Sequence, residues 1–193
     1  MITLCMDTAH RYLVLAILKD DKIIASYSEY AWKKQSEIVF VELNKLMQEA
    51  GVKPDDIAQM VITKGPGSYT GIRIAMTIAK VFCTTKPVKL YTLGTLQLYA
   101  GMADDAEVIL DARSNRVYYG HYLKGVKQSE GIKTLDELVK DNPYIGDVEL
   151  LDKTGSTPDF VANFLALKPL WEPVNNVHTL IPEYFKEESE YLK

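Results

Sequence analysis

At 193 residues the chain can bury a substantial core, either as one domain or as two small lobes. An apolar content of 47% and a charged content of 25% are ordinary for a globular protein, and a net charge of −4 gives no overall case for binding nucleic acid or a membrane surface. No apolar run approaches the ~20 residues of a membrane span, and the N-terminus lacks the basic start of a signal peptide. Cys5 and Cys83 both lie in apolar surroundings, which indicates reduced, buried thiols and favours the cytoplasm.

The first elements in chain order are short strands followed by a helix. Apolar runs separated by tight polar turns predict an antiparallel meander over residues 2–7, 12–18 and 23–30. A helix is predicted over residues 35–50, with Ser36 as its N-cap. Gly51 follows at the position where a glycine commonly ends a helix.

This helix carries more apolar residues than one buried face requires. Its core stripe has the helical spacing of three and four, at Val39, Leu43, Leu46, Met47 and Ala50. Ile38, Phe40 and Val41 add apolar surface on neighbouring faces. The helix is either enclosed within its own fold or offers the extra surface to a partner, and the pattern leaves both interpretations open.

A glycine-rich loop, Lys64-Gly-Pro-Gly-Ser-Tyr-Thr-Gly71, joins a predicted strand over residues 57–63 to a predicted helix over residues 72–82. Strand, glycine loop and helix is an arrangement that directs backbone N–H groups at an anion. The loop has neither the Gly-Lys-[Ser/Thr] ending of a Walker A loop nor the G-x-G-x-x-G spacing. The alternative is a structural role, with Ser68 as N-cap and small residues on a side where another backbone can approach, at Gly71, Ala75 and Ala79.

Charge is unevenly distributed around this loop. The sequence has no acidic residue between Asp56 and Asp104, and this stretch holds Lys64, Arg73, Lys80, Lys86 and Lys89. These residues are either solvated cations on an apolar segment or a positive surface for an anionic partner.

A strand over residues 88–92 and a helix over residues 95–102, capped by Thr95, complete a predicted first lobe over residues 1–103. The order of strand, terminal Asp and tight turn seen around Asp7 then recurs around Asp111, which indicates an internal duplication. We therefore expect a smaller, truncated second lobe over residues 104–193. Its predicted elements are strands over 107–110 and 117–123, a helix over 134–140, a strand ending over 149–151 and a helix over 159–167.

Catalytic chemistry has weak support. The three histidines have no metal-ligand spacing, and no G-x-S-x-G motif is present. In a nucleotide enzyme, Asp7 and Asp111 would hold Mg²⁺ from two sides of a cleft. Neither is followed by the glycine turn that embraces phosphate, which disfavours ATP chemistry by this chain alone. No catalytic residue, cofactor or metal is expected.

The glycine loop and its continuation through Ile72-Arg73-Ile74-Ala75 strongly resemble the signature of the TsaB (YeaZ) family. The resemblance spans most of the chain and weakens between residues 125 and 180. Further matching segments are Asp7-Thr8, Gln35-Ser36-Glu37, Asp111-Ala112-Arg113, Val117-Tyr118 and Pro182-Glu183-Tyr184.

The resemblance implies an α/β fold of the actin/hexokinase-like (ASKHA) type with two lobes. It also implies a non-catalytic partner of TsaD, the transferase that places threonylcarbamoyl on adenosine 37 of tRNAs reading codons that start with A. The ATPase TsaE would join the assembly, the chain alone would form a homodimer, and tRNA contact would be indirect or weak. The metal-binding histidine pair of the relatives is missing at residues 33–39.

The site residues implied are an interface on two helices and the remnant of a nucleotide or anion site. The expected interface comprises Ser36, Val39, Phe40, Leu43, Met47, Ser68, Tyr69, Thr70, Gly71, Ile72, Ala75 and Ala79. The expected remnant site comprises Asp7, Thr8, Gly67 and Asp111. The alternative function is a small-molecule kinase or nucleotide-binding enzyme of the same fold class that uses Asp7, Asp111 and the glycine loop.

Overall fold

A computed structural model describes residues 1–187 and residue 190. The chain forms two compact units, and each is described by itself. The first comprises Met1–Thr95 together with Trp171–Glu183, and the second comprises Leu96–Leu170 together with the described residues from Tyr184 onward. The described residues include no helix that is both long enough and apolar enough to cross a membrane.

The first unit is built on a six-stranded mixed sheet with the order β10-β5-β4-β1-β2-β3. The predicted meander is confirmed, because the first three strands pair antiparallel in sequence order. β4 pairs parallel with β1, and β5 pairs parallel with β4. The strands are β1 (Ile2–Asp7), β2 (Tyr12–Lys19), β3 (Lys22–Tyr30), β4 (Ile57–Thr63), β5 (Lys89–Leu93) and β10 (Glu172–Pro173).

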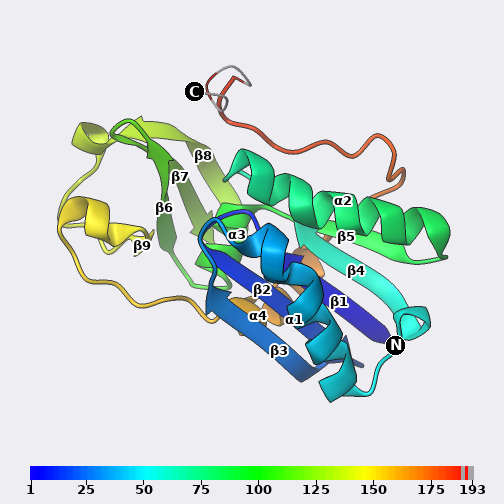
Figure 1. Cartoon of the computed structure of the whole chain (residues 1–193). Coiled ribbons are helices and arrows are strands. Elements are labelled where there is room, and N and C mark those ends of the chain that lie inside the picture. Colours follow the sequence, from blue (N-terminus) through cyan, green and yellow to red (C-terminus); the bar gives the residue numbers. More distant parts are fainter. Residues whose placement is uncertain (188–189, 191–193) are drawn as a thin grey trace. The chain divides into compact units, whose positions relative to one another are not determined.

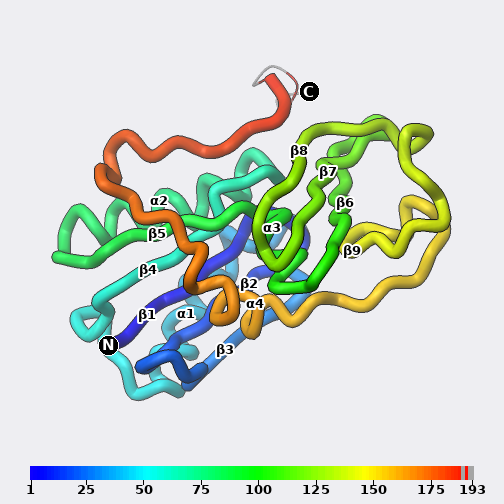
Figure 2. Tube along the Cα trace, turned by 180° about the vertical axis from the view of Figure 1, so that it is seen from behind, coloured from blue at the N-terminus to red at the C-terminus, as the bar shows by residue number. Residues whose placement is uncertain are grey.

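The last strand of this sheet comes from far along the chain. From Trp171 the chain returns to the first unit, where β10 pairs antiparallel with β5 (Figure 2). Residues 171–183 belong to the first unit, and within them the two-residue strand β10 extends the edge of the first sheet.

Two helices, α1 (Gln35–Ala50) and α2 (Tyr69–Thr85), lie on one face of this sheet (Figure 1). α1 packs over β2 and β3, α2 packs mainly over β4, and the two helices contact each other. Gly51 ends α1 in the left-handed conformation, with φ 62°, as predicted. The N-cap prediction for α1 is wrong, because Lys34 occupies that position without a side-chain cap and Ser36 is already helical.

α2 begins three residues earlier and ends three residues later than the predicted helix over residues 72–82. Its N-cap is Ser68, as expected, and the Ser68 hydroxyl accepts a hydrogen bond of 3.2 Å from the Gly71 N–H. Because that bond satisfies a backbone donor of the first turn, the helix can start directly after the loop.

The second unit contains a four-stranded sheet with the order β8-β7-β6-β9. Its strands are β6 (Ala106–Arg113), β7 (Arg116–Leu123), β8 (Val126–Thr134) and β9 (Ile145–Gly146). In chain order, α3 (Thr95–Ala100) follows β5, and α4 (Phe160–Ala166) follows the strands of the second sheet. Short 3₁₀ turns also occur, at η1 (Pro54–Asp56), η2 (Leu135–Glu137), η3 (Val148–Leu151) and η4 (Lys168–Leu170).

Three predictions from Thr95 onward are wrong. The helix expected over residues 134–140 is the single 3₁₀ turn η2, and the strand expected over 149–151 is the 3₁₀ turn η3. Thr95 is not a side-chain cap, because its buried hydroxyl has no hydrogen-bond partner among the described residues. The sequence also missed β8, an edge strand whose first four residues are exposed and therefore lack the apolar alternation of a half-buried strand.

Candidate functional site: the glycine loop and the two surface helices

The turn between β1 and β2 joins three segments of the first unit through three successive carbonyl oxygens. Each carbonyl accepts one hydrogen bond: Ala9 from the Ser68 N–H at 2.7 Å, His10 from the Gln35 side-chain amide at 2.7 Å, and Arg11 from the Ala31 N–H at 2.9 Å. The glycine loop, the start of α1 and the end of β3 therefore meet at this turn. We call residues 8–11 the hub turn.

Two glycines of the loop allow its close approach to the hub turn. A Cβ on Gly67 would lie 2.2 Å from the carbonyl oxygen of Ala9, and a Cβ on Gly71 would lie 2.2 Å from that of Thr8. Side-chain carbons do not come so close to backbone oxygen, so any other residue would force the two segments apart. The predicted structural role of these glycines is supported by this packing.

Three backbone donors at the end of the loop and the start of α2 are used inside the protein. The Ser68 N–H donates to Ala9, the Gly71 N–H donates to the Ser68 hydroxyl, and the Ile72 N–H donates to the Ser68 carbonyl at 2.9 Å. A phosphate cradle needs such groups to point at the ligand. The N–H groups of these three residues are directed at protein oxygens instead.

Asp7 and Thr8 are buried against the loop rather than presented to solvent. One Asp7 carboxylate oxygen accepts hydrogen bonds from the Ala9 N–H at 2.9 Å and from the Thr63 hydroxyl. Burial raises the pKa of Asp7, while these hydrogen bonds and the nearby His10 act to lower that pKa. The Thr8 hydroxyl donates to the Gly71 carbonyl at 2.6 Å and accepts from the Ala75 N–H at 3.2 Å.

Of the four residues expected in a remnant nucleotide or anion site, the structure brings together Asp7, Thr8 and Gly67. Asp111 belongs to β6 of the second unit, where its carboxylate accepts a 2.7 Å hydrogen bond from the Arg113 N–H. No group of His, Cys, Asp or Glu side chains that could hold a metal ion occurs among the residues that the structure describes.

The residues expected at a partner interface fall into two groups. The buried group packs inside the first unit and has little or no surface to offer: Val39, Met47, Gly71, Ile72, Ala75 and Ala79. The accessible group is exposed or half-buried: Ser36, Phe40, Leu43, Ser68, Tyr69 and Thr70. The small residues Gly71 and Ala75 of α2 therefore contact Thr8 in the hub turn of their own chain.

Exposed apolar side chains remain on both helices. Phe40 and Val41 of α1 are 60% and 52% exposed, and Val81 of α2 is 60% exposed. On α2, half-buried Ile74 and Ile78 precede Val81 at helical spacing, so the apolar stripe continues along the helix. We call Phe40, Val41 and Val81 the outer apolar surface.

Sequence reasoning identified part of this surface. Phe40 and Val41 stood out because they lie off the core stripe of α1. Val81 was not expected at the interface although it lies within the predicted helix over residues 72–82, because spacing alone does not show which face of that helix is exposed.

The cations around the glycine loop are largely engaged by the protein itself. Lys64 lies 2.6 Å from Glu172 and 3.6 Å from Glu183, and Lys86 forms a salt bridge with Asp55. Lys80 donates to the carbonyl of His178 at 3.4 Å. Residues 171–183, the returning segment, supply three of these partners. The sequence alone does not reveal this pairing because the partners lie far away along the chain.

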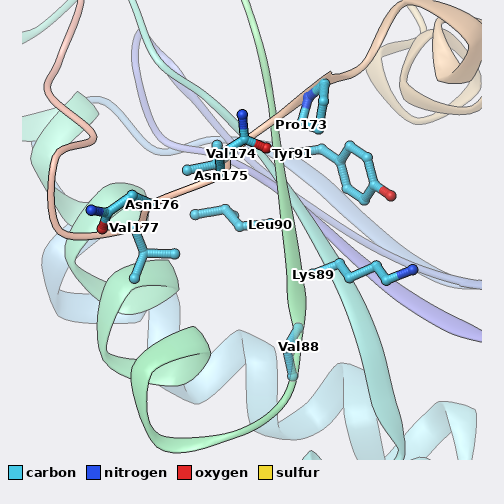
Figure 3. Close-up of a pocket in the computed structure, with 9 residues that line it drawn as sticks. All are labelled: Val88, Lys89, Leu90, Tyr91, Pro173, Val174, Asn175, Asn176 and Val177. Atoms are coloured by element: carbon cyan, nitrogen blue, oxygen red, sulfur yellow. The ribbon is translucent and has the colours of Figure 1, made fainter.

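A half-open pocket of about 460 Å³ lies between β5 and the returning segment (Figure 3). Its lining is mixed, with the apolar residues Val88 and Leu90 on one side and Val174 and Val177 on the other. Lys89 and two asparagines are the polar contributions. The pocket adjoins the start of β5, whereas the hub turn follows the end of the parallel strand β1.

Solved structures with the same fold define the class of protein. A structure described as an uncharacterized protein with similarity to peptidase YEAZ from Pseudomonas aeruginosa has a TM-score of 0.77 at 20% identity, covering 96% of this chain and 99% of that chain. YeaZ from Pseudomonas aeruginosa has a TM-score of 0.73 at 18% identity, covering 95% and 99%. The fold is thus that of YeaZ proteins, and the expected actin/hexokinase-like α/β class is confirmed.

A family model described as TsaD: tRNA N6-adenosine threonylcarbamoyltransferase matches residues 21–143, which is more than half of the chain. The chain belongs to this family. A protein of Bacillus subtilis (strain 168) named tRNA threonylcarbamoyladenosine biosynthesis protein TsaB is 28% identical over 216 residues, covering 96% of this chain and 94% of that protein. The TsaB protein of Escherichia coli (strain K12) is 25% identical, covering 62% and 54%. The resemblance to TsaB drawn from the sequence is confirmed.

Proposed function

We propose that this chain is a non-catalytic subunit of the machinery that makes threonylcarbamoyladenosine at position 37 of tRNA, and that it binds a TsaD-type transferase through α1 and α2. The names of its relatives place them in threonylcarbamoyladenosine biosynthesis. The observation that carries the proposal is the outer apolar surface, which two neighbouring helices present to solvent.

Physical chemistry favours a partner on this surface. Burying a Phe or Val side chain contributes roughly 1.5–3 kcal/mol, and apolar surfaces on adjacent helices are typical of helix-in-groove and bundle interfaces. The buried side chains beneath it, such as Val39 and Ala75, hold the helices in place and make no direct contact with a partner. The same surface supports a homodimer when the transferase is missing, and TsaE joins the assembly without a site assigned on this chain.

The alternative of a kinase or other nucleotide enzyme has less support. The N–H groups of Ser68, Gly71 and Ile72 bond to the protein, and Asp7 is buried with a raised pKa, whereas a metal-binding carboxylate must be ionised and reachable. Calorimetry with ATP and Mg²⁺ on the isolated chain separates the two functions. We expect no binding. Tight binding that Asp7→Ala abolishes would favour the enzyme.

The direct test is co-purification with the TsaD protein of the same organism, followed by an assay of threonylcarbamoyladenosine in tRNA with and without this chain. Phe40→Asp and Val81→Asp should each lower recovery of the complex at least tenfold, because an exposed charge would be buried unpaired at the interface. Val139→Asp is the matched control, since Val139 is also 60% exposed but belongs to the second unit. Unchanged recovery with both helix variants would contradict the proposed interface. The same assembly acts in the cytoplasm under this proposal.

A further inference from the structure

Basic side chains gather around the hub turn. Lys33 and Lys34 are exposed and immediately precede α1, and Arg73 is exposed on α2 with its guanidinium 3.8 Å from the centre of the Tyr69 ring. Arg11 belongs to the hub turn and is half-buried. The hydrogen bonds from Gln35, Ser68 and Ala31 to the hub turn fix these segments together. We call Arg11, Lys33, Lys34 and Arg73 the basic cluster.

Charge at this end of the first unit opposes the net charge of −4 for the chain. The three segments that meet there, residues 8–12, 30–36 and 64–73, contain no Asp or Glu. The nearest acidic residues are buried Asp7 before the first segment, Glu29 and Glu37 on either side of the middle one, and Glu183, which lies 3.6 Å from Lys64 of the third. Neither Lys33 nor Lys34 forms a salt bridge with any residue that the structure describes, in contrast to Lys64 and Lys86. A local concentration of positive charge on a negatively charged protein fits an anionic partner.

Aromatic rings lie among these cations. Tyr30 is 61% exposed and meets Tyr12 edge-to-face, with ring centres 5.8 Å apart. Trp32 is half-buried and meets His10 edge-to-face at 6.1 Å. Cations that bind phosphate beside rings that stack on bases are the combination found in single-stranded RNA sites. Tyrosine is also common at protein interfaces, so the choice of RNA over an acidic protein surface follows from the tRNA named for the relatives.

The backbone conformation of Lys33 allows its charge to be tested cleanly. Its φ is 64°, in the left-handed region, where glycine is favoured and a lysine is strained. A glycine would relieve the strain but would not provide a charge. Lys33→Gly therefore removes the charge without straining the turn.

We propose that the basic cluster and Tyr30 form a direct contact with the tRNA, in which Lys33, Lys34 and Arg73 bind the ribose-phosphate backbone and Tyr30 stacks on an unpaired base. The inference rests on the proposed function, because that function brings tRNA to the assembly. It goes further by giving this chain an RNA surface distinct from the outer apolar surface. The proposed RNA surface does not include Lys64, Lys80 or Lys86, because these side chains already form salt bridges or a hydrogen bond within the protein.

The test measures binding of a fluorescently labelled, unmodified tRNA transcript with adenosine at position 37 to the full chain, alone and with TsaD, between 50 and 200 mM salt. Lys33→Gly should weaken binding three- to tenfold and reduce the slope of log K against log salt by about 1. Lys34→Gln and Arg73→Gln should act similarly, and Tyr30→Ala should weaken binding with little change of slope.

Lys124→Gly is the matched control. Lys124 is also an exposed lysine in a left-handed conformation, with φ 49°, but it lies in the turn between β7 and β8 of the second unit. Lys33→Gly and Lys124→Gly should both leave the midpoint of urea unfolding unchanged or higher, because glycine adopts the left-handed backbone conformation without strain. Equal binding by wild type and Lys33→Gly, or an equal loss with Lys124→Gly, would overturn the proposal.

Two further outcomes keep the two proposals apart. If Lys33→Gly abolished co-purification with TsaD but left RNA binding unchanged, the cluster would be a site for an acidic protein surface and the RNA proposal would be wrong. Phe40→Asp should lose TsaD and retain binding of the transcript by the chain alone. If Phe40→Asp retained TsaD while Lys33→Gly still lost RNA, the proposed partner interface would fail and the RNA surface would stand.

Discussion

The Thr8 hydroxyl donates a 2.6 Å hydrogen bond to the carbonyl oxygen of Gly71, and the Thr8 carbonyl occupies the space where a side chain on Gly71 would begin. This pair locks the first turn of α2 onto the end of β1. A loop whose glycines resemble a phosphate cradle thus binds its own neighbouring turn. The position of α2, and with it the location of Val81 and Arg73, depends on this contact.

Replacement of Gly71 by alanine should destabilise the protein strongly. The new Cβ would lie 2.2 Å from a backbone oxygen that a flexible side chain cannot move away, so one of the two segments must shift. We expect a loss of about 2–3 kcal/mol in the free energy of unfolding, measured by urea titration. Gly131→Ala is the control, because a Cβ there meets no atom within 4 Å. Equal stability of the two variants would contradict the packing role of Gly71.

Asp7→Asn should make the protein more stable at neutral and higher pH. Burial raises the pKa of Asp7, so the folded protein holds this proton more tightly than the unfolded chain. The stability that the carboxyl contributes is therefore greatest at acid pH and is lost as the pH rises through its folded pKa. An asparagine oxygen can still accept from Ala9 and Thr63.

The check is a set of urea titrations of wild type and Asp7→Asn between pH 4 and pH 8. The difference should favour the variant increasingly as the pH rises. Asp141→Asn, at an exposed position, should leave the profile unchanged. A variant less stable than wild type at pH 8 would mean that the ionised Asp7 stabilises the fold through its hydrogen bonds.

Much of the first unit could be predicted because its signals are local. The apolar runs of β1 and β2 are near-continuous, since these strands are buried along almost their whole length, and Gly51 and Ser68 mark one end of each helix. The wrong N-cap at Ser36 and the missed strand β8 both depend on contacts with distant parts of the chain, which local sequence patterns do not show. One depends on the hydrogen bond from Gln35 to the hub turn, and the other on pairing with β7.

The candidate site was less predictable for a related reason. Spacing shows which residues share a face of a helix, but it does not show which face the fold covers. Gly71 and Ala75 have the pattern of a contact surface, and the structure uses that surface for Thr8. Likewise, Lys64 lacks an acidic neighbour in sequence, and its partners Glu172 and Glu183 lie more than a hundred residues away.

The two thiols should react slowly in the native protein. Cys5 is fully buried, and burial raises the pKa of half-buried Cys83 to about 11. At pH 8 roughly one Cys83 thiol in a thousand is then ionised, compared with roughly a quarter for a free cysteine. Reaction with an aromatic disulfide should be at least tenfold slower for the native chain than for the chain in urea. Cys83→Ala should remove most of the remaining native signal, and rapid labelling of wild type would contradict the buried environment of Cys83.

Phe185→Ala should loosen the second unit locally. Phe185 meets the buried Tyr118 of β7 edge-to-face, with ring centres 6.1 Å apart, and neighbouring Lys186 bonds to the Ala112 carbonyl on β6. Phe185 and Lys186 therefore cover part of these two strands. Removing a half-buried ring should cost about 1–2 kcal/mol and expose Tyr118. Hydrogen exchange should accelerate in peptides from residues 106–123 and stay unchanged in β1 and β4. Phe40→Ala is the control, since its ring is 60% exposed and covers no strand of this unit. Unaltered exchange in β6 and β7 would mean that Phe185 covers them without stabilising them.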